Sequence, residues 1–283
     1  MSSLSFFDFL YLGSDLWRVQ RNPLAALFMR LVGPLGTHAR IRNTRVLNNT
    51  SGLDLHQKRI LDIGCGHGYA LFWLARRFPS ARLEGVEIDP VQVSECQQAA
   101  EAQGYSHLKF KIGTFQEISE EGAYDLIISI DVLEHVPDDA GMLLKMASLL
   151  HPGGAALIHV PLRHQLQRRI FSVYGKHSVH DHVRDEYLPD EIRTKVEQAG
   201  LTVVKLEYGF GVWGELSFEL NNLFWTNRAL RTITAMLTLP VSLVSGYIDA
   251  RSKPARGNSI LIVARRPESQ VVMESHESKR TNH

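Results

Sequence analysis

The chain has little cysteine, no excess of one charge and no long uninterrupted apolar run. Its 283 residues include only Cys65 and Cys96. That is too few for a disulfide framework or a zinc module, so we expect a reducing, cytoplasmic setting. The formal net charge of +1 gives no sign of a nucleic-acid partner. No stretch of about 18 residues is strongly apolar, so we expect no membrane-spanning helix, and the N-terminus lacks the basic start of a secretion signal.

The chain is nevertheless 44% apolar, and its middle alternates strand-like and helix-like segments. Hydrophobic periodicity and turn residues predict strands at 59–63, 82–87, 108–112, 124–130, 155–160, 201–208 and 259–264. Helices are predicted between them at 69–78, 89–104, 138–150 and 189–199. Strands that alternate with helices favour an α/β fold, with a mostly parallel sheet covered by helices on both faces.

Three segments lie outside this alternation. Residues 1–57 are rich in aromatic residues and arginine and predict a helical N-terminal cap. Residues 209–257 form a long helical insertion before the last strand. The polar residues 267–283 predict a disordered tail. The domain between cap and tail is therefore expected to span 58–266.

The segment LDIGCGHGYALFWLARRF, residues 61–78, places glycines at alternate positions between a strand and a helix. A helix start leaves free backbone N–H groups, and Gly64, Gly66 and Gly68 would let a ligand approach them. A dinucleotide fingerprint, G-x-G-x-x-G, would need a glycine where Tyr69 stands. Asp62, just before the loop, also disfavours a pyrophosphate. It favours a ligand with a cationic end.

Glu87 ends the second predicted strand, 23 residues after Gly64. Ligands of open parallel sheets bind at the carboxyl ends of the strands, where this side chain would lie. A carboxylate there can accept hydrogen bonds from both hydroxyls of a ribose. We therefore interpret Glu87 as a ribose acceptor.

These motifs together resemble the class I S-adenosylmethionine-dependent methyltransferases. The matching stretches are D-x-G-x-G-x-G, G-V-E-I-D-P, Y-D-L-I-I-S-I-D-V-L-E-H-V-P-D and L-x-P-G-G, within about residues 57–208 and again at 259–264. The resemblance implies a Rossmann-like, seven-stranded sheet with an antiparallel last strand, and S-adenosylmethionine as the cofactor. It implies a cofactor site made of Asp62, Gly64, Cys65, Gly66, Gly68, Glu87, Ile88, Gly113, Thr114, Ser129 and Asp131.

Within that implied site, Asp62 would lie near the amino group of the cofactor and the glycines under its methionine part. Ile88, Gly113 and Thr114 would flank the adenine. Thr114 departs from the family, which commonly has aspartate at this position. It keeps a hydrogen-bond acceptor and loses the charge.

Acceptor chemistry is less well marked. A histidine often removes the proton that an oxygen or nitrogen acceptor loses. His135, in LEHV, and His182, in KHSVHDHVRDEY, are the candidates, with His182 and Arg184 as acceptor contacts. A helix-start histidine that only packs or bonds locally, and a solvated loop, are the alternatives. The spacing of the histidines matches no metal-ligand signature, so no metal is predicted.

The insertion carries no charge between Thr232 and Ile248 but is interrupted by threonine, serine and Pro240. We expect it to pack with residues 1–57 over the carboxyl ends of the strands and to line an acceptor pocket. Aromatic lining would come from Trp213, with Phe218, Phe224 or Trp225 as further candidates. Plain core packing and contact with a membrane surface are the other interpretations.

The favoured function is a cytoplasmic methyltransferase that acts on an oxygen, nitrogen or carbon of a small acceptor, which is apolar or lipid-like, with a peripheral membrane contact. The alternative is a non-catalytic S-adenosylmethionine-binding regulator or partner subunit. A nicotinamide oxidoreductase is disfavoured by the missing G-x-G-x-x-G. Nucleic-acid methylation is disfavoured because DVLE, at 131–134, replaces the [ND]-P-P-[FYW] motif of amino-methylating enzymes and no basic domain is present.

Overall fold

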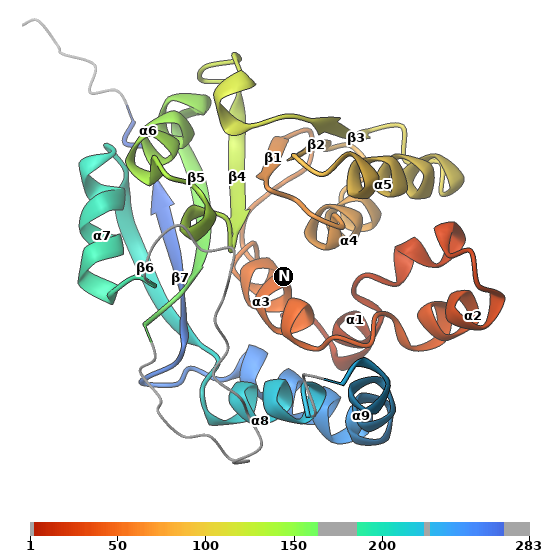
Figure 1. Cartoon of the computed structure of the whole chain (residues 1–283). Coiled ribbons are helices and arrows are strands. Elements are labelled where there is room, and N and C mark those ends of the chain that lie inside the picture. Colours follow the sequence, from red (N-terminus) through yellow and green to blue (C-terminus); the bar gives the residue numbers. More distant parts are fainter. Residues whose placement is uncertain (1–2, 164–185, 224–226, 269–283) are drawn as a thin grey trace, which may run out of the picture.

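A computed structural model describes residues 3–163, 186–223 and 227–268 of the chain (Figure 1). Its strands are β1 (Arg59–Ile63), β2 (Arg82–Glu87), β3 (Leu108–Ile112), β4 (Tyr124–Ile130), β5 (Leu150–Pro161), β6 (Thr202–Gly209) and β7 (Ser259–Arg265). The helices between them are α4 (Tyr69–Arg77), α5 (Pro90–Ala102), α6 (Asp139–Leu149) and α7 (Pro189–Gln198). Four strand predictions match to the residue. The others differ at their ends, most for β5, which extends through the Pro-Gly-Gly turn.

The sheet confirms the predicted fold class. Within the described residues it has seven strands in the order β3-β2-β1-β4-β5-β7-β6. β7 runs antiparallel to both β5 and β6, and the pairs from β3 to β5 are parallel. Pairing of Ile63 with both Val86 and Ser129 brings the carboxyl ends of β1, β2 and β4 to the same edge. That edge is where the motifs of the sequence converge.

Helices cover the two faces of the sheet. On one face, α4 and α5 bury Leu71, Phe72 and Val93 in a core with strand residues such as Ile60 and Leu126. On the other face, α6 and α7 bury Met142, Leu143 and Ile192 against strand residues such as Leu61 and Ile262. Alternate strand residues therefore face opposite cores, as the period of two requires.

The N-terminal segment forms α1 (Phe6–Tyr11), the 3-10 turn η1 (Ser14–Val19), α2 (Pro23–Val32) and α3 (His38–Asn48). α3 is more than a cap, because its Val46 and Leu47 are fully buried in the same core as Leu157 of β5. It thus covers the sheet while its first turn reaches the carboxyl ends of the strands, where Arg42 contacts Asp131. In Figure 1 α3 lies between the sheet and α1.

The insertion forms α8 (Val212–Asn221) and α9 (Arg228–Arg251), which pack against α3, and α9 also contacts α1 (Figure 1). Two buried contacts fix this arrangement. Arg45 of α3 donates to the backbone oxygen and the carboxylate of Asp249, and the hydroxyls of Thr37 and Ser217 are 2.8 Å apart. The insertion is therefore helical and packs on the N-terminal helices at the carboxyl side of the sheet, as the sequence predicts.

The expectation that no stretch of about 18 residues is strongly apolar needs correction. By length and composition, α9 is long and apolar enough to cross a membrane over Ala229–Arg251, with a mean hydropathy of 1.4 in its most apolar stretch. Threonines, serines and Pro240 interrupt this stretch, but it contains so few charged residues that its mean hydropathy stays high. However, 44% of that stretch is buried inside the protein.

Candidate active site

The glycine loop joins β1 to α4, and its three glycines all have positive φ angles: 69° at Gly64, 52° at Gly66 and 66° at Gly68. Gly64 and Gly68 are required by the protein itself. A Cβ at Gly64 would overlap the Val132 side chain, and one at Gly68 would lie 2.8 Å from the Phe110 ring. Gly66 differs, since among the described residues only Gln92 Oε1, at 3.4 Å, comes within 4 Å of its Cβ position. Gly66 is thus the glycine whose missing side chain leaves room for a ligand.

Glu87 lies directly beside this loop. Its Oε2 accepts a hydrogen bond from the Gly66 N–H at 2.9 Å, and its Oε1 accepts from the N–H groups of Ile88 and Asp89 at 2.8 and 3.1 Å. A carboxylate offers about four acceptor positions, so one remains for a ligand hydroxyl. Glu87 therefore holds the loop to the end of β2 and still has capacity for one of the two predicted hydrogen bonds from ribose hydroxyls.

Asp62 and Ser129 are the next-to-last residues of β1 and β4 and are both buried, and because Ser129 pairs with Ile63, their side chains point to opposite faces of the sheet. Within the described part of the chain, Asp62 Oδ1 and Ser129 Oγ have no hydrogen-bond partner. Burial, and then the nearby Glu87 carboxylate, raise the pKa of Asp62 well above its ordinary value. A buried carboxyl of this kind is stabilised by a cation or a donor placed against it. The amino group of a bound amino-acid moiety would satisfy it.

The part of the carboxyl edge of the sheet that β2 and β3 form is apolar. Ile88 and Ile112, at the ends of β2 and β3, are 69% and 61% exposed, and a flat aromatic ligand would cover them. Gly113 is placed beside them by its N–H, which donates to the Glu87 carbonyl at 3.0 Å. The Thr114 N–H donates to Glu117 in the 3-10 turn η2 (Phe115–Glu117). These residues lie where the resemblance places an adenine.

The side chain of Cys65 points toward the sheet and away from the open side of the glycine loop. A Cβ added to Gly85 on β2 would lie 2.7 Å from the Cys65 Sγ, so the thiol packs under the loop against the sheet. Only the backbone of Cys65 is left to contact a ligand. Cys65 and Cys96 are both free thiols.

Asp131, predicted as a cofactor contact, is held by protein groups on both oxygens. Its Oδ2 accepts from Arg42 of α3, and its Oδ1 lies 2.5 Å from His159 Nδ1, whose Nε2 is 3.0 Å from the Ser259 hydroxyl. Burial would raise the pKa of Asp131, but Arg42 and His159 together hold it below its ordinary value. With a positive φ of 53°, Asp131 ties α3 to the end of β4 and closes the site.

The 3-10 turn η3 (Leu133–His135) presents Glu134 to the interior and leaves His135 exposed. Glu134 is only 1% exposed, and its Oε2 has no hydrogen-bond partner among the residues described. Burial, and then the charge of Asp131, raise the pKa of Glu134 to about 9. Glu134 is therefore a neutral acid at pH 7 and can donate a hydrogen bond into the site.

His38, one helical turn before Arg42 on the same face of α3, is a second residue that the sequence did not single out. Its Nδ1 is buried without a hydrogen-bond partner in the described residues, and its ring lies edge-on to Phe218 of α8, with 6.2 Å between centroids. Burial, and then Arg42, lower the pKa of His38 to about 4. His38 is therefore neutral at pH 7. No motif marks it, since its position depends on how α3 packs.

Tyr69 completes the roof of the glycine loop. Its ring packs against Gly13, where a Cβ would lie 2.7 Å from the ring, and stacks on His67 with 5.9 Å between centroids. Burial raises the pKa of Tyr69 to about 12. The N-terminal segment therefore contacts the site at two places: at Tyr69, beside the glycine loop, and at Asp131, after the end of β4.

The remaining predicted residues are placed elsewhere or not at all. Trp213 lies on the outer side of α8, half-exposed, in a groove shared with α9. His182, Arg184, Phe224, Trp225 and residues 269–283 of the predicted tail lie outside the described residues. No group of three or more potential metal ligands occurs among the residues described.

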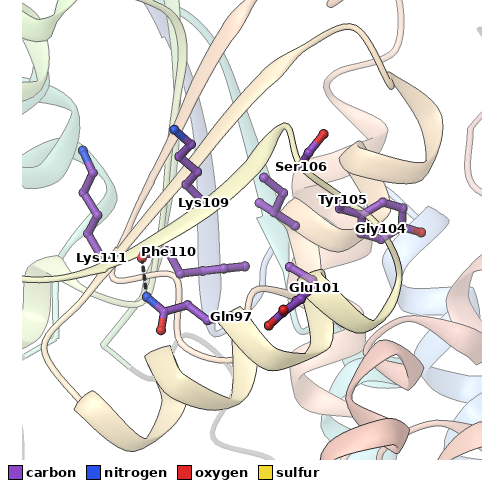
Figure 2. Close-up of a pocket in the computed structure, with 10 residues that line it drawn as sticks. Gln97, Glu101, Gly104, Tyr105, Ser106, Lys109, Phe110 and Lys111 are labelled. Atoms are coloured by element: carbon purple, nitrogen blue, oxygen red, sulfur yellow. Dashed lines mark hydrogen bonds between the residues drawn. The ribbon is translucent and has the colours of Figure 1, made fainter.

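A separate hollow of about 580 Å³ lies between α5 and the edge strand β3 (Figure 2). Gln97, Tyr105, Lys109 and Phe110 line it, and Gln97 donates to the Phe110 carbonyl at 3.0 Å. None of the residues predicted to hold the cofactor lines this hollow, so it is not part of the site at the carboxyl ends of the strands.

Comparison with known proteins identifies the chemistry of this site. A family model described as a methyltransferase domain matches residues 27–206, well over half of the chain. The chain belongs to the class I S-adenosylmethionine-dependent methyltransferases. The methyltransferase uses S-adenosylmethionine as its cofactor. Asp62, the glycine loop and Glu87 are suited to hold it, because they offer an unpaired carboxyl, an open approach and a spare acceptor.

Its relatives are methyltransferases of small molecules. The methyltransferase is 34% identical to trans-aconitate 2-methyltransferase of Deinococcus radiodurans over 38% of this chain and 39% of that protein. It is 26% identical to a ubiquinone biosynthesis O-methyltransferase of Acinetobacter baylyi over 51% of this chain and 63% of that protein. The match thus spans less than two thirds of each relative, and it does not determine the acceptor.

Solved structures share its fold at low identity. Phosphoethanolamine N-methyltransferase 2 of Haemonchus contortus, in complex with S-adenosyl-L-methionine, superposes with a TM-score of 0.60 at 18% identity, covering 94% of this chain and 60% of that one. The [4+2]-cyclase SpnF superposes with a TM-score of 0.59 at 17% identity, covering 82% of both chains. One architecture therefore serves different chemistry, and the acceptor has to be argued from the site.

Proposed function

We propose that this methyltransferase transfers the methyl group of S-adenosylmethionine to an oxygen, nitrogen or carbon of a small, apolar or lipid-like acceptor. One observation carries the proposal. Among the buried polar atoms without partners in the described residues, His38 Nδ1 and Glu134 Oε2 both lie near Asp131, and the Phe218 ring of α8 lies against His38. A site of this composition suits an apolar molecule that carries one or two polar groups.

The names of several relatives agree with such an acceptor. Besides the ubiquinone enzyme, a tocopherol O-methyltransferase of Arabidopsis thaliana is 32% identical over 36% of this chain and 29% of that protein. Both names refer to lipid-like molecules. We accordingly propose a cytoplasmic enzyme that works at a membrane surface.

The bound cofactor supplies an already activated methyl group, so the protein mainly has to align the acceptor and remove a proton where one is lost. Neutral His38 can accept a hydrogen bond from an acceptor hydroxyl, and protonated Glu134 can donate one to a neighbouring oxygen. We propose these two residues as acceptor contacts, with His38 as the base. His135, exposed in the structure, and His182 remain predictions from the sequence.

The test is methyl transfer from labelled cofactor to lipid, quinone and small-metabolite pools, followed by isolation of the labelled product. With that acceptor, His38→Ala should lower kcat about 100-fold, because general base catalysis contributes at least about that factor. Cofactor affinity should stay unchanged. The matched control is His56→Ala, an exposed histidine just before β1. Label appearing only in water-soluble metabolites would contradict the lipid-like acceptor, and full activity of His38→Ala would remove His38 from the chemistry.

A further inference from the structure

The outer face of α9 is apolar over nearly the whole helix. The side chains exposed on it are Leu230, Ile233, Met236, Leu237, Val241, Val244 and Ile248, with Leu237 76% exposed. They recur at the helical spacing of three and four residues and so form one stripe. A surface helix of a globular protein normally turns charged and polar residues to water on this side. The face is therefore built to contact something other than water.

The inner face of the same helix is committed to the protein. Ala235, Leu239 and Leu243 are buried, and Asp249 is fully buried where it accepts hydrogen bonds from the N–H groups of Gly211 and Gly214 and from Arg45. Crossing a bilayer would strip these contacts. With about 1.5 Å of rise per residue, the stripe from Leu230 to Ile248 instead forms an apolar ridge about 27 Å long on the surface.

α2 repeats the pattern. Its Leu24, Leu27 and Leu31 are all more than half exposed, with Leu24 at 78%, and no residue of α2 is fully buried. Its inner residues Phe28 and Val32 pack in the same hydrophobic cluster as Leu239 and Leu243 of α9. Two helices far apart in the sequence thus share one buried cluster, and each leaves an apolar outer face exposed.

The charges around these helices have one sign. No aspartate or glutamate occurs in residues 16–53 or 220–248, the two segments that contain α2 and most of α9. Exposed Arg21 precedes α2, and exposed Arg30 is in its last turn. Arg231 is in the first turns of α9, and exposed Lys253 and Arg256 follow its end. Basic residues therefore border the apolar surface at both ends of α9.

This distribution distinguishes a membrane from a second copy of the chain. In a two-fold dimer the same surface meets itself, so the basic ends would face each other with no carboxylate between them. Anionic headgroups, in contrast, attract lysine and arginine while apolar side chains enter the acyl region. Trp213 lies at the border, lining a groove of about 330 Å³ with Val241, Val244 and Ile248, and tryptophan favours such an interface.

We propose that the outer faces of α9 and α2 form a membrane-docking surface that lies on an anionic lipid bilayer. This surface deepens the proposed function, because an enzyme bound to the membrane meets a lipid-like acceptor where that acceptor is dissolved. The inference depends on the proposed function only for the lipid-like acceptor. Trp213 then acts as an interfacial anchor, and its predicted contact with the acceptor is replaced by a contact with lipid.

The experiment measures vesicle binding of the full chain and needs no turnover, so it can fail while the proposed methyl transfer stands. Co-sedimentation is compared between vesicles of phosphatidylcholine alone and vesicles with an equal part of phosphatidylglycerol. The wild type should bind the mixed vesicles and lose binding as salt is raised. Leu237→Glu with Val241→Glu should lower binding about tenfold or more, since two apolar side chains that would enter the acyl region are replaced by charges. Lys253→Glu with Arg256→Glu should weaken binding to the anionic vesicles only.

The matched control is Leu144→Glu, which replaces an apolar side chain 55% exposed on α6, remote from the surface. It should bind like the wild type, and all variants should keep cofactor affinity. The proposal is overturned if the wild type does not bind the mixed vesicles, or if Leu144→Glu loses as much binding as the α9 variant. A dimer in sedimentation velocity that Leu237→Glu with Val241→Glu dissociates, without vesicle binding, would assign the surface to a second copy.

Discussion

The two sides of the candidate site differ in how far apart their residues are in the sequence. The cofactor side is assembled from β1, β2, β3 and β4 within residues 59–131, and each functional residue stands at the end of a strand. The acceptor side combines α3 with α8, η3 and α9, as in the contact of Arg45 with Asp249, 204 positions apart. The first side has a motif and the second has none. Short-range constraints on backbone shape leave marks in the sequence, whereas long-range packing needs only compatible surfaces.

The buried polar groups of the two sides have two roles. Asp62 on the cofactor side, and His38 and Glu134 on the acceptor side, carry atoms without partners in the described structure, as expected of groups that await a ligand. Two other carboxylates are saturated: Asp249 of the acceptor side by backbone N–H groups and Arg45, and Asp131, where the two sides meet, by Arg42 and His159. These saturated carboxylates hold the helices in place. Variants can therefore impair one side and spare the other.

The largest effect is expected from Gly66→Val, which impairs the cofactor side alone. The valine would enter the open space over the loop and would have to adopt a φ of 52°. We expect cofactor binding to fall below detection in calorimetry while the fold is kept. Gly122→Val is the control, because Gly122 also has a positive φ, 62°, with no described atom within 4 Å of its Cβ position. Binding by Gly66→Val at wild-type strength would refute the assignment of the loop.

Asp249→Ala should impair the acceptor side by removing the carboxylate that holds α8 and Arg45. Leaving one partner of a buried ion pair uncompensated typically costs about 3–5 kcal/mol. We expect that loss in the free energy of unfolding measured by urea denaturation. Glu197→Ala, which breaks the exposed pair of Arg193 with Glu197 on α7, should cost about 0.5 kcal/mol or less. Equal losses in the two variants would mean that the buried contact does not hold the helices.

Glu87→Ala should weaken cofactor binding by about 1.5–3 kcal/mol, the usual range for hydrogen bonds to a charged group. The structure also predicts the effect of Glu87→Gln. Both oxygens of Glu87 accept backbone N–H groups, so the amide of glutamine must turn a donor toward a donor. We therefore expect Glu87→Gln to lose nearly as much in calorimetry as Glu87→Ala. Glu101→Ala, an exposed carboxylate on α5, serves as control, and wild-type binding by both Glu87 variants would exclude the ribose contact.

The effect of Glu134→Gln is smallest near pH 4.5, the ordinary pKa of a glutamate, and grows as the pH rises. The folded protein holds a proton on Glu134 up to a pKa of about 9, whereas the ordinary value is 4.5. Between these values the folded state binds more protons, so wild-type stability falls as the pH rises. Glutamine cannot ionise. The variant should therefore match the wild type near pH 4.5 and become more stable toward pH 9, by at most about 1.4 kcal/mol per pH unit.

Urea denaturation across that range measures the difference, with the exposed Glu121→Gln as control. A constant difference between Glu134→Gln and the wild type would show that Glu134 is not held as a neutral acid.

The sequence alone determined the sheet and the cofactor edge of this methyltransferase. Short, nearly continuous apolar runs set the central strands, and the order of strands and helices set a parallel sheet, because right-handed crossovers leave few alternatives. Gly66 and Glu87 were predictable because the loop and the end of β2 follow directly from strands that the sequence marks. The sequence marked three glycines as positions where a ligand could approach, but Gly64 and Gly68 are required by packing within the protein.

Only the tertiary structure decided which polar residues enter the site from the helices. Whether His135 or Glu134 faces inward depends on one 3-10 turn, and His38 reaches the site because α3 packs across the sheet. The same packing left the outer side of α9 apolar and exposed, although the sequence showed only an uncharged stretch. Side-chain direction is set by contacts between segments about 200 residues apart, and a linear pattern does not record them.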